Sequence, residues 1–123
     1  MNIVIWIVQI LLALAFGMAG ILKTTQPLDK LSERMGWVKD FPPAIVRLIG
    51  TLELLAAIGL ILPALTGILP ILTPLAAVGL VLTMIGAALT HARRGEYSGI
   101  GANIILLLLA AFVVYGRFVA VPL

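Results

Sequence analysis

Hydrophobic residues occur in four long runs that short polar or proline-containing segments separate. The runs cover about residues 3–22, 44–62, 74–92 and 100–119. Each approaches the roughly 20 apolar residues that a helix needs to cross a bilayer. The pattern therefore predicts an all-α fold, an antiparallel four-helix transmembrane bundle forming a single transmembrane domain over residues 1–123. No basic residue precedes the first run, which is longer than a signal-peptide core, so we expect a retained helix.

The longest polar stretch, residues 23–43, carries a second pattern. Leucine, methionine and valine recur there at helical spacing, and charged residues fill the opposite side: Leu28, Leu31, Met35 and Val38 against Asp29, Lys30, Glu33, Arg34 and Lys39. This spacing favours a short amphipathic helix in the membrane interface, with Trp37 and Phe41 as anchors at headgroup level. An ordinary polar loop is the alternative.

Prolines mark the ends of the middle runs. Pro42 and Pro43 precede the second run, where proline suits a first helical turn. Pro63 is predicted to end that helix and to open an uncharged hairpin over residues 63–73. Thr73 and Pro74 then resemble an N-cap and a first helical residue of the third span.

Positive residues predict the orientation. One side of the bundle holds most of them, Lys23, Lys30, Arg34, Lys39, Arg47, Arg93 and Arg94, and the other side holds Arg117 alone. Because loops rich in Lys and Arg stay in the cytoplasm, we expect both termini to lie outside. The expected location is a bacterial cytoplasmic (inner) membrane.

Composition supports a membrane protein and narrows its chemistry. The chain is 63% hydrophobic and 11% charged, whereas soluble domains are about 45–50% apolar and 25% charged. The absence of cysteine excludes disulfides, thiolate metal sites and a cysteine nucleophile, and a single histidine excludes bis-histidine haem ligation. The net charge of +3 lies at the membrane edges, so we expect lipid rather than nucleic acid as the partner.

Each predicted span has one face of small or polar residues. At 100° per residue these faces are Gln9, Ala13, Phe16, Gly17, Gly20 and Lys23; Gly50, Glu53 and Ala57; Gly79, Thr83, Gly86 and Thr90; and Asn103, Leu107, Ala110, Val114 and Arg117. Small residues and hydrogen bonds, rather than the hydrophobic effect, hold membrane helices together. We therefore expect the four faces to point at one another.

Glu53 is the costly residue of this interior because it falls near the middle of its span. An ionised carboxylate there costs about 3 kcal/mol on insertion scales, so it must be paired, hydrated or protonated. The candidate partners are Lys23, Arg47, Asn103, Arg117, Gln9 and Thr83. Arg47 lies about 120° round the helix from Glu53, which argues against that pair. Glu53 is either an interhelical clamp or a ligand, proton or cation site.

His91 lies at the end of the third span beside Arg93 and Arg94. Either it caps carbonyls at the helix end, or it binds a ligand head together with Glu53 and Asn103. The candidate polar-core or ligand-binding residues are therefore Gln9, Lys23, Arg47, Glu53, His91, Asn103 and Arg117. The sequence indicates no catalytic residue and no metal-ligand set.

These residues resemble a family pattern. Gly20 to Lys23, the segment Arg47–Leu60 with its Gly-Thr-Leu-Glu core, the segment His91–Glu96, and Asn103 and Arg117 together resemble the DoxX family, in particular its DoxX-like branch. The resemblance implies a bacterial four-helix membrane bundle. It also implies partners in redox systems, through quinone-linked or oxidative-stress complexes, and in a eukaryotic branch a role in receptor assembly.

Three functions remain open at this point. The first is a non-catalytic accessory or assembly subunit that binds a membrane-protein partner or another copy of itself. The second is a small transporter or lipophilic-ligand carrier that uses Glu53. The third is a membrane subunit of a quinone-dependent oxidoreductase. No resident cofactor is expected, with a quinone or a lipid as the molecules left open.

Overall fold

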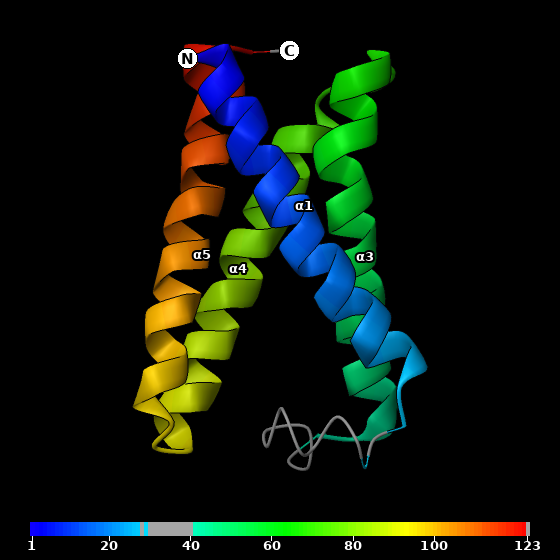
Figure 1. Cartoon of the computed structure of the whole chain (residues 1–123), viewed down its shortest axis with the longest axis vertical. Helices are drawn as coiled ribbons and strands as arrows, with labels where there is room; N and C mark the ends of the chain where they lie inside the picture. The colour runs from blue at the N-terminus through cyan, green and yellow to red at the C-terminus, as the bar shows by residue number, and fades with distance from the viewer. Residues whose placement is uncertain (28, 30–40, 123) are drawn as a thin grey trace.

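The computed structural model describes residues 1–27, 29 and 41–122, and it consists of long helices (Figure 1). The helices are α1 (Asn2–Thr25), α3 (Pro43–Thr66), α4 (Leu72–Arg93) and α5 (Tyr97–Tyr115), which continues into a π-helical turn, η2 (Gly116–Ala120). No strand occurs in the described part of the chain. The predicted all-α class is confirmed. The expected interfacial helix, with Leu28, Leu31, Met35 and Val38, lies outside the described residues.

The helices run antiparallel, so both termini lie at one end of the bundle (Figure 1). The turn from α4 to α5, the end of α1 and the start of α3 lie at the opposite end. Four segments are long and apolar enough to cross a membrane: Asn2–Thr25, Pro43–Thr66, Leu72–Arg93 and Ile100–Ala120. The prediction of four helices long and apolar enough to span a membrane is thereby confirmed for the described part of the chain.

The interior and the surface both consist largely of apolar side chains. Leu12, Phe16, Leu60 and Leu80 are buried in the core. Outward-facing leucines such as Leu82 stay more than half exposed. In water such a surface would favour aggregation, whereas in a bilayer lipid tails cover it. The structure thus has the exterior of a protein immersed in lipid.

Helices α1 and α3 approach each other closely through two glycines. A Cβ atom added to Gly20 would lie 2.7 Å from the carbonyl oxygen of Gly50, and one added to Gly50 would lie 2.6 Å from the Cβ atom of Lys23. Such contact without side chains is a common way for membrane helices to associate. It brings the last turn of α1 against the middle of α3.

Pro63 does not end its helix, contrary to the sequence prediction. Helix α3 continues to Thr66 and ends at Gly67, whose φ of 74° is left-handed. Proline lacks the N–H that would bond the carbonyl of Gly59 four residues earlier. The hydroxyl of Thr73 donates to that carbonyl instead, at 2.8 Å. Thr73 is therefore not the predicted N-cap: α4 begins at Leu72, and Thr73 bonds across to α3.

The packing face of α4 also differs from the prediction. Gly79 and Gly86 are exposed, and a Cβ atom on either would meet nothing within 4 Å. The buried residues are instead Ala77, Leu80 and Met84, together with the first turn of the helix. Apolar side chains on another face provide the contact area in this helix, so Thr83, Gly86 and Thr90 of the predicted face are left to border a cavity.

Candidate functional site

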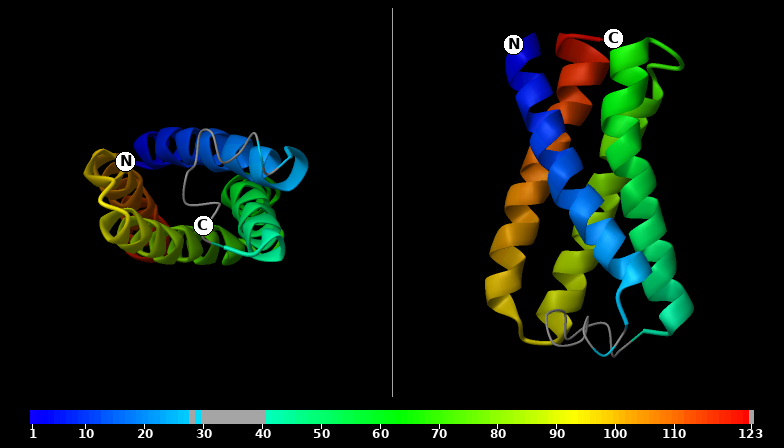
Figure 2. Two further views of the ribbon diagram at one scale, coloured as in Figure 1. Left: turned by 90° about the horizontal axis from the view of Figure 1, so that it is seen from below. Right: turned by 45° about the vertical axis from the view of Figure 1, so that its right-hand side comes forward.

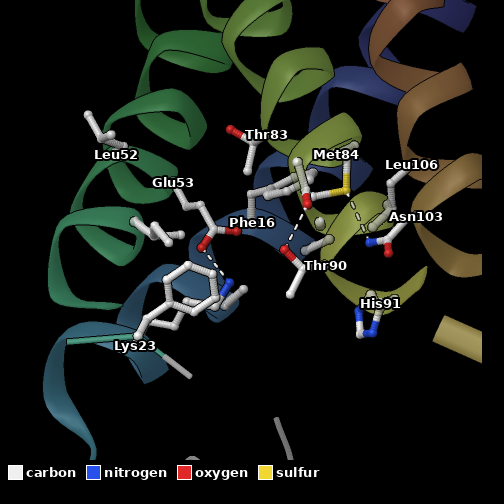
Figure 3. Close-up of a pocket in the computed structure, with 16 residues that line it drawn as sticks. Phe16, Lys23, Leu52, Glu53, Thr83, Met84, Thr90, His91, Asn103 and Leu106 are labelled. Atoms are coloured by element: carbon white, nitrogen blue, oxygen red, sulfur yellow. Dashed lines mark hydrogen bonds and ion pairs between the residues drawn. The ribbon is translucent and has the colours of Figure 1, made fainter. Parts of the chain in front are cut away.

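A cavity of about 560 Å³ lies between the helices, and Figure 3 shows the side chains that line it. Lys23, at the end of α1, and His91, at the end of α4, place it toward the end of the bundle away from the termini. All four helices contribute to its lining, which is mainly apolar and includes Phe16 from α1, Leu52 from α3, Met84 from α4 and Leu106 from α5. Its volume falls in the range of small-molecule sites in proteins, about 300–1,000 Å³. Polar groups occupy two opposite sides of it.

A buried ion pair forms the first polar side. Lys23 Nζ lies 2.6 Å from Glu53 Oε1, joining the end of α1 to the middle of α3. Glu53 is 3% exposed, and the Lys23 side chain is 11% exposed. A pair this buried requires close geometry, because desolvation opposes it. Both residues also line the cavity. The Glu53 carboxylate is therefore paired with Lys23 and also borders a space large enough for a small molecule.

The local backbone positions this pair. Gly20 and Gly50 let the two helices approach until the Lys23 stem rests on Gly50, one turn before Glu53. Arg47 does not contact Glu53; its Nη1 donates to the carbonyl of Lys23 at 2.7 Å. That carbonyl belongs to the last turn of α1, where helical carbonyls have no internal donor. Arg47 thus fixes the helix end that carries the lysine.

Asn103 forms the opposite polar side, on α5 (Figure 3). Its Nδ2 points to the sulfur of Met84 at 3.6 Å. Its Oδ1 is buried and has no hydrogen-bond partner within the described chain. Asn103 as a whole is 9% exposed and lines the cavity. A buried carbonyl oxygen without a donor is rare in proteins and requires an explanation.

Three further polar residues line the cavity from α4. The hydroxyl of Thr83 donates to the carbonyl of Gly79 at 2.8 Å, and that of Thr90 donates to the carbonyl of Gly86 at 2.9 Å. The His91 Nδ1 lies 3.2 Å from Glu96 Oε1. His91 is therefore held by a side chain of the following turn and lines the cavity (Figure 3).

Gln9 and Arg117 form a separate network near the termini. Arg117 Nε donates to Gln9 Oε1 at 2.7 Å, and its Nη1 donates to Asn2 Oδ1 at 2.8 Å. Gln9 Nε2 in turn donates to the carbonyl of Leu60 at 2.6 Å. The guanidinium also lies 5.6 Å from the ring centroid of Trp6. Gln9 and Arg117, both proposed above as partners of Glu53, instead join α1, α3 and η2 at the other end.

The four helices form two pairs, and Figure 2 shows α1 and α3 meeting at the end away from the termini. Helix α1 packs mainly on α3, and α4 packs mainly on α5. Among the described residues, three side-chain hydrogen bonds cross between the pairs, from Arg117 to Gln9, from Arg117 to Asn2 and from Thr73 to Gly59, all toward the terminal end. Around the cavity, the bonds made by Lys23 to Glu53 and by Asn103 to Met84 each stay within one pair.

Sequence reasoning missed two partners in these networks. In the sequence Met84 is one more apolar residue of a predicted span, and nothing there indicates that its sulfur faces the Asn103 amide. Asn2 precedes the first apolar run and has the pattern of a helix end, but it accepts a hydrogen bond from Arg117, at the far end of the chain. Only the fold brings these positions together.

Comparison of the chain with known protein families identifies the family to which it belongs. The family model described as the DoxX-like family matches residues 7–113, which cover α3 and α4, most of α1 and α5, and all residues that line the cavity. The chain belongs to the DoxX-like family. The resemblance noted in the sequence is thereby confirmed, and DoxX-like membership with four apolar helices makes this a multi-pass membrane protein. No curated protein and no solved structure gives a significant match to this DoxX-like chain.

Proposed function

We propose that this DoxX-like protein is a non-catalytic membrane subunit that binds the polar head of a lipophilic molecule in the cavity. The observation that carries the proposal is the cavity itself, about 560 Å³ in volume, with the Lys23–Glu53 pair on one side and the unpartnered Asn103 oxygen on the other. An acid that served only to clamp two helices would need no such space. A quinone or a lipid has the required combination of an apolar tail and a polar head.

A cavity-filling variant tests this binding. A Cβ atom at Gly86 meets nothing within 4 Å, and Gly86 lines the cavity, so we expect the larger side chain of Gly86→Leu to occupy part of the cavity. Gly79→Leu is the matched control: it lies two turns earlier on the same helix, is equally unobstructed, and does not line the cavity.

The readout is the set of lipophilic molecules retained after extraction in native-lipid nanodiscs, identified by native mass spectrometry. The wild type and Gly79→Leu should retain one defined molecule, and Gly86→Leu should lose it while keeping the same helical content. Equal retention by all three proteins, or retention by none, would refute binding in the cavity.

The accessory role is supported by the resemblance, which implies partners in redox complexes or in receptor assembly. Mild-detergent purification tests it, and a stoichiometric membrane-protein partner or a homo-oligomer is expected. Glu53→Gln should leave that association unchanged, since the carboxylate lies inside the bundle and not on the lipid-facing surface. Purification as a lone monomer under conditions that preserve other membrane complexes contradicts the accessory role.

A proton-coupled carrier is the second candidate, because the Glu53 carboxylate borders the cavity. Reconstituted protein should then release protons when it binds a ligand, and Glu53→Gln should abolish the release. The absence of proton release between about pH 5 and 9, a range that brackets neutral pH, counts against the carrier and leaves the binding subunit.

We also propose a bacterial inner-membrane location with both termini outside. The basic residues Lys23, Arg47, Arg93 and Arg94 lie toward the end opposite the termini, as the positive-inside rule requires for that end to be cytoplasmic. The chain has no cysteine, so single cysteines can report each side. Thr66→Cys and Thr25→Cys are matched, because each is the exposed last residue of its helix. An impermeant maleimide should label the first in intact cells and the second only after permeabilisation.

A further inference from the structure

Helices α3 and α4 touch at one level of the bundle and separate at another. The contact is at Gly59, where an added Cβ atom would lie 3.0 Å from the Cβ atom of Ala76 and 3.7 Å from the carbonyl oxygen of Leu72. Thr73 bonds the Gly59 carbonyl at the same level. From there the two helices diverge toward the end of the bundle away from the termini (Figure 1).

The faces that touch at this contact border the cavity farther along. Leu52 lies seven residues before Gly59, nearly two full turns, so the two residues share one face of α3. Thr83 lies seven residues after Ala76 and shares its face of α4 in the same way. Both Leu52 and Thr83 line the cavity, as does Gly86. We call the space between Leu52 on α3 and Thr83 and Gly86 on α4 the α3–α4 gap.

This gap is open to the outside of the bundle. Leu52 is 55% exposed, and Gly86 is exposed with nothing within 4 Å of an added Cβ atom, yet both line the cavity. Residues that border a cavity and the outer surface at once mark an opening. Both belong to segments apolar enough to cross a membrane, so the opening faces acyl chains. On α5, by contrast, the lining residues Asn103 and Leu106 are buried and half-buried.

We infer that the ligand is a long-chain amphiphile that enters sideways from the membrane through the α3–α4 gap and leaves its tail there among the lipids. This inference rests on the proposed binding function and specifies its ligand class. The charged pair of Lys23 and Glu53 lies inside, where the head would be. Lipid tails are as apolar as leucine, so a chain that passes Leu52 into the bilayer loses nothing by staying outside.

Three probes with one head and different tails test the inference. They are tetramethylbenzoquinone, which has no tail, and analogues in which a decyl or an eicosyl chain replaces one methyl group. Each is titrated into the full-length protein in phosphatidylcholine nanodiscs, and occupancy at equal mole fraction in the membrane is read by native mass spectrometry. The decyl and eicosyl probes should bind equally tightly, because the added carbons lie in lipid both before and after binding.

Blocking the gap should act on the tail alone. The chain has no cysteine, so a single introduced cysteine can be alkylated with N-benzylmaleimide in detergent before reconstitution. Leu52→Cys and Thr83→Cys place the benzyl group at the two edges of the gap. Leu55→Cys and Leu82→Cys are the matched controls, because each is exposed on the same helix and does not line the cavity.

Alkylation at either edge should weaken binding of the decyl probe about tenfold or more relative to the unlabelled variant, the scale of an overpacked contact. The tail-less probe should bind the labelled and unlabelled forms equally. Alkylation of the two control variants should leave the affinity for every probe unchanged. Each variant is compared with its own unlabelled form, so any effect of the substitution itself cancels.

The outcomes separate the two proposals. If the probes bind the wild type but neither edge label affects the decyl probe, the gap is not the path of the tail and the binding function stands. If only a label at Ala15→Cys, the exposed cavity-lining residue of α1, weakens the decyl probe, the tail leaves beside α1 and the inference is overturned. Binding of the decyl but not the eicosyl probe overturns it as well, since the ligand is then enclosed whole. If no probe binds the wild type, both proposals fail for quinone heads.

Discussion

The hydroxyl of Thr73, in the first turn of α4, donates a hydrogen bond to the backbone carbonyl of Gly59 in α3. In a regular helix the N–H of residue 63 would bond to that carbonyl, but residue 63 is a proline. Inside a membrane no water can take the place of the missing donor. The threonine of one helix thus completes the hydrogen bonding of its neighbour and lets α3 pass through Pro63.

Thr73→Val should therefore destabilise the protein by about 1–3 kcal/mol, the cost of a buried polar group left unsatisfied. The free energy of unfolding can be measured by titration with dodecyl sulfate in mixed micelles. Pro63→Ala restores an N–H at position 63, so Thr73→Val should cost clearly less in that background. Equal losses in both backgrounds contradict the proposed relationship.

Gly20→Ala should destabilise the α1–α3 contact by about 1–3 kcal/mol, as overpacking does. The added methyl group would lie 2.7 Å from the Gly50 carbonyl oxygen, which is backbone and cannot rotate away. Gly17→Ala is the control, since its methyl group would lie 3.6 Å from Ala57 in ordinary contact. Comparable stability of the two variants in the same micelle titration counts against the close approach of these helices.

The Lys23–Glu53 pair should show strong coupling. Lys23→Met leaves a buried carboxylate without its cation and should destabilise by about 3–5 kcal/mol. Adding Glu53→Met removes that charge, so the double variant should recover most of the loss. A double variant as unstable as the sum of the two single variants shows that the pair has no energetic coupling.

Gln9 links Arg117 to the Leu60 carbonyl, so its loss affects two partners at once. Gln9→Met keeps the length of the side chain and removes both hydrogen bonds, which should destabilise by about 1–3 kcal/mol for each unsatisfied group. In an Arg117→Met background the same substitution should be milder, because only the hydrogen bond from Gln9 to the Leu60 carbonyl is then lost. Thermal unfolding followed by circular dichroism measures this difference.

The sequence predicts the helices well because their signal is local. Four apolar runs, glycines at the α1–α3 contact and a single acid in the second run are each visible along the chain. The buried position of Glu53 follows from its place in an apolar span, and Lys23 lies on the same face as Gly20. These features depend on one helix at a time, and one helix has a known geometry.

The misplaced residues depend on neighbours. From the sequence alone, Pro63 predicts the end of a helix. Only the structure shows that Thr73 supplies the hydrogen-bond donor that the Gly59 carbonyl would otherwise lack. The face of α4 cannot be chosen from its own residues, because apolar side chains on another face make the contacts. Gln9 and Arg117 lie on the inward faces of their helices, as Glu53 does, but at a different level along the bundle axis. An angle around a helix does not specify the depth at which two helices meet.

The division into two helix pairs has a consequence for selectivity. Side-chain hydrogen bonds cross between the pairs near the chain termini, from Arg117 and Thr73, whereas around the cavity the bonds that the described chain makes stay within each pair. Side-chain hydrogen bonds between the two pairs are thus confined, among the described residues, to the end that carries the termini. If the proposed ligand binds, a change in the width of the cavity would break none of these bonds, so we expect the polar groups that line the cavity to contribute more to selectivity than its exact shape.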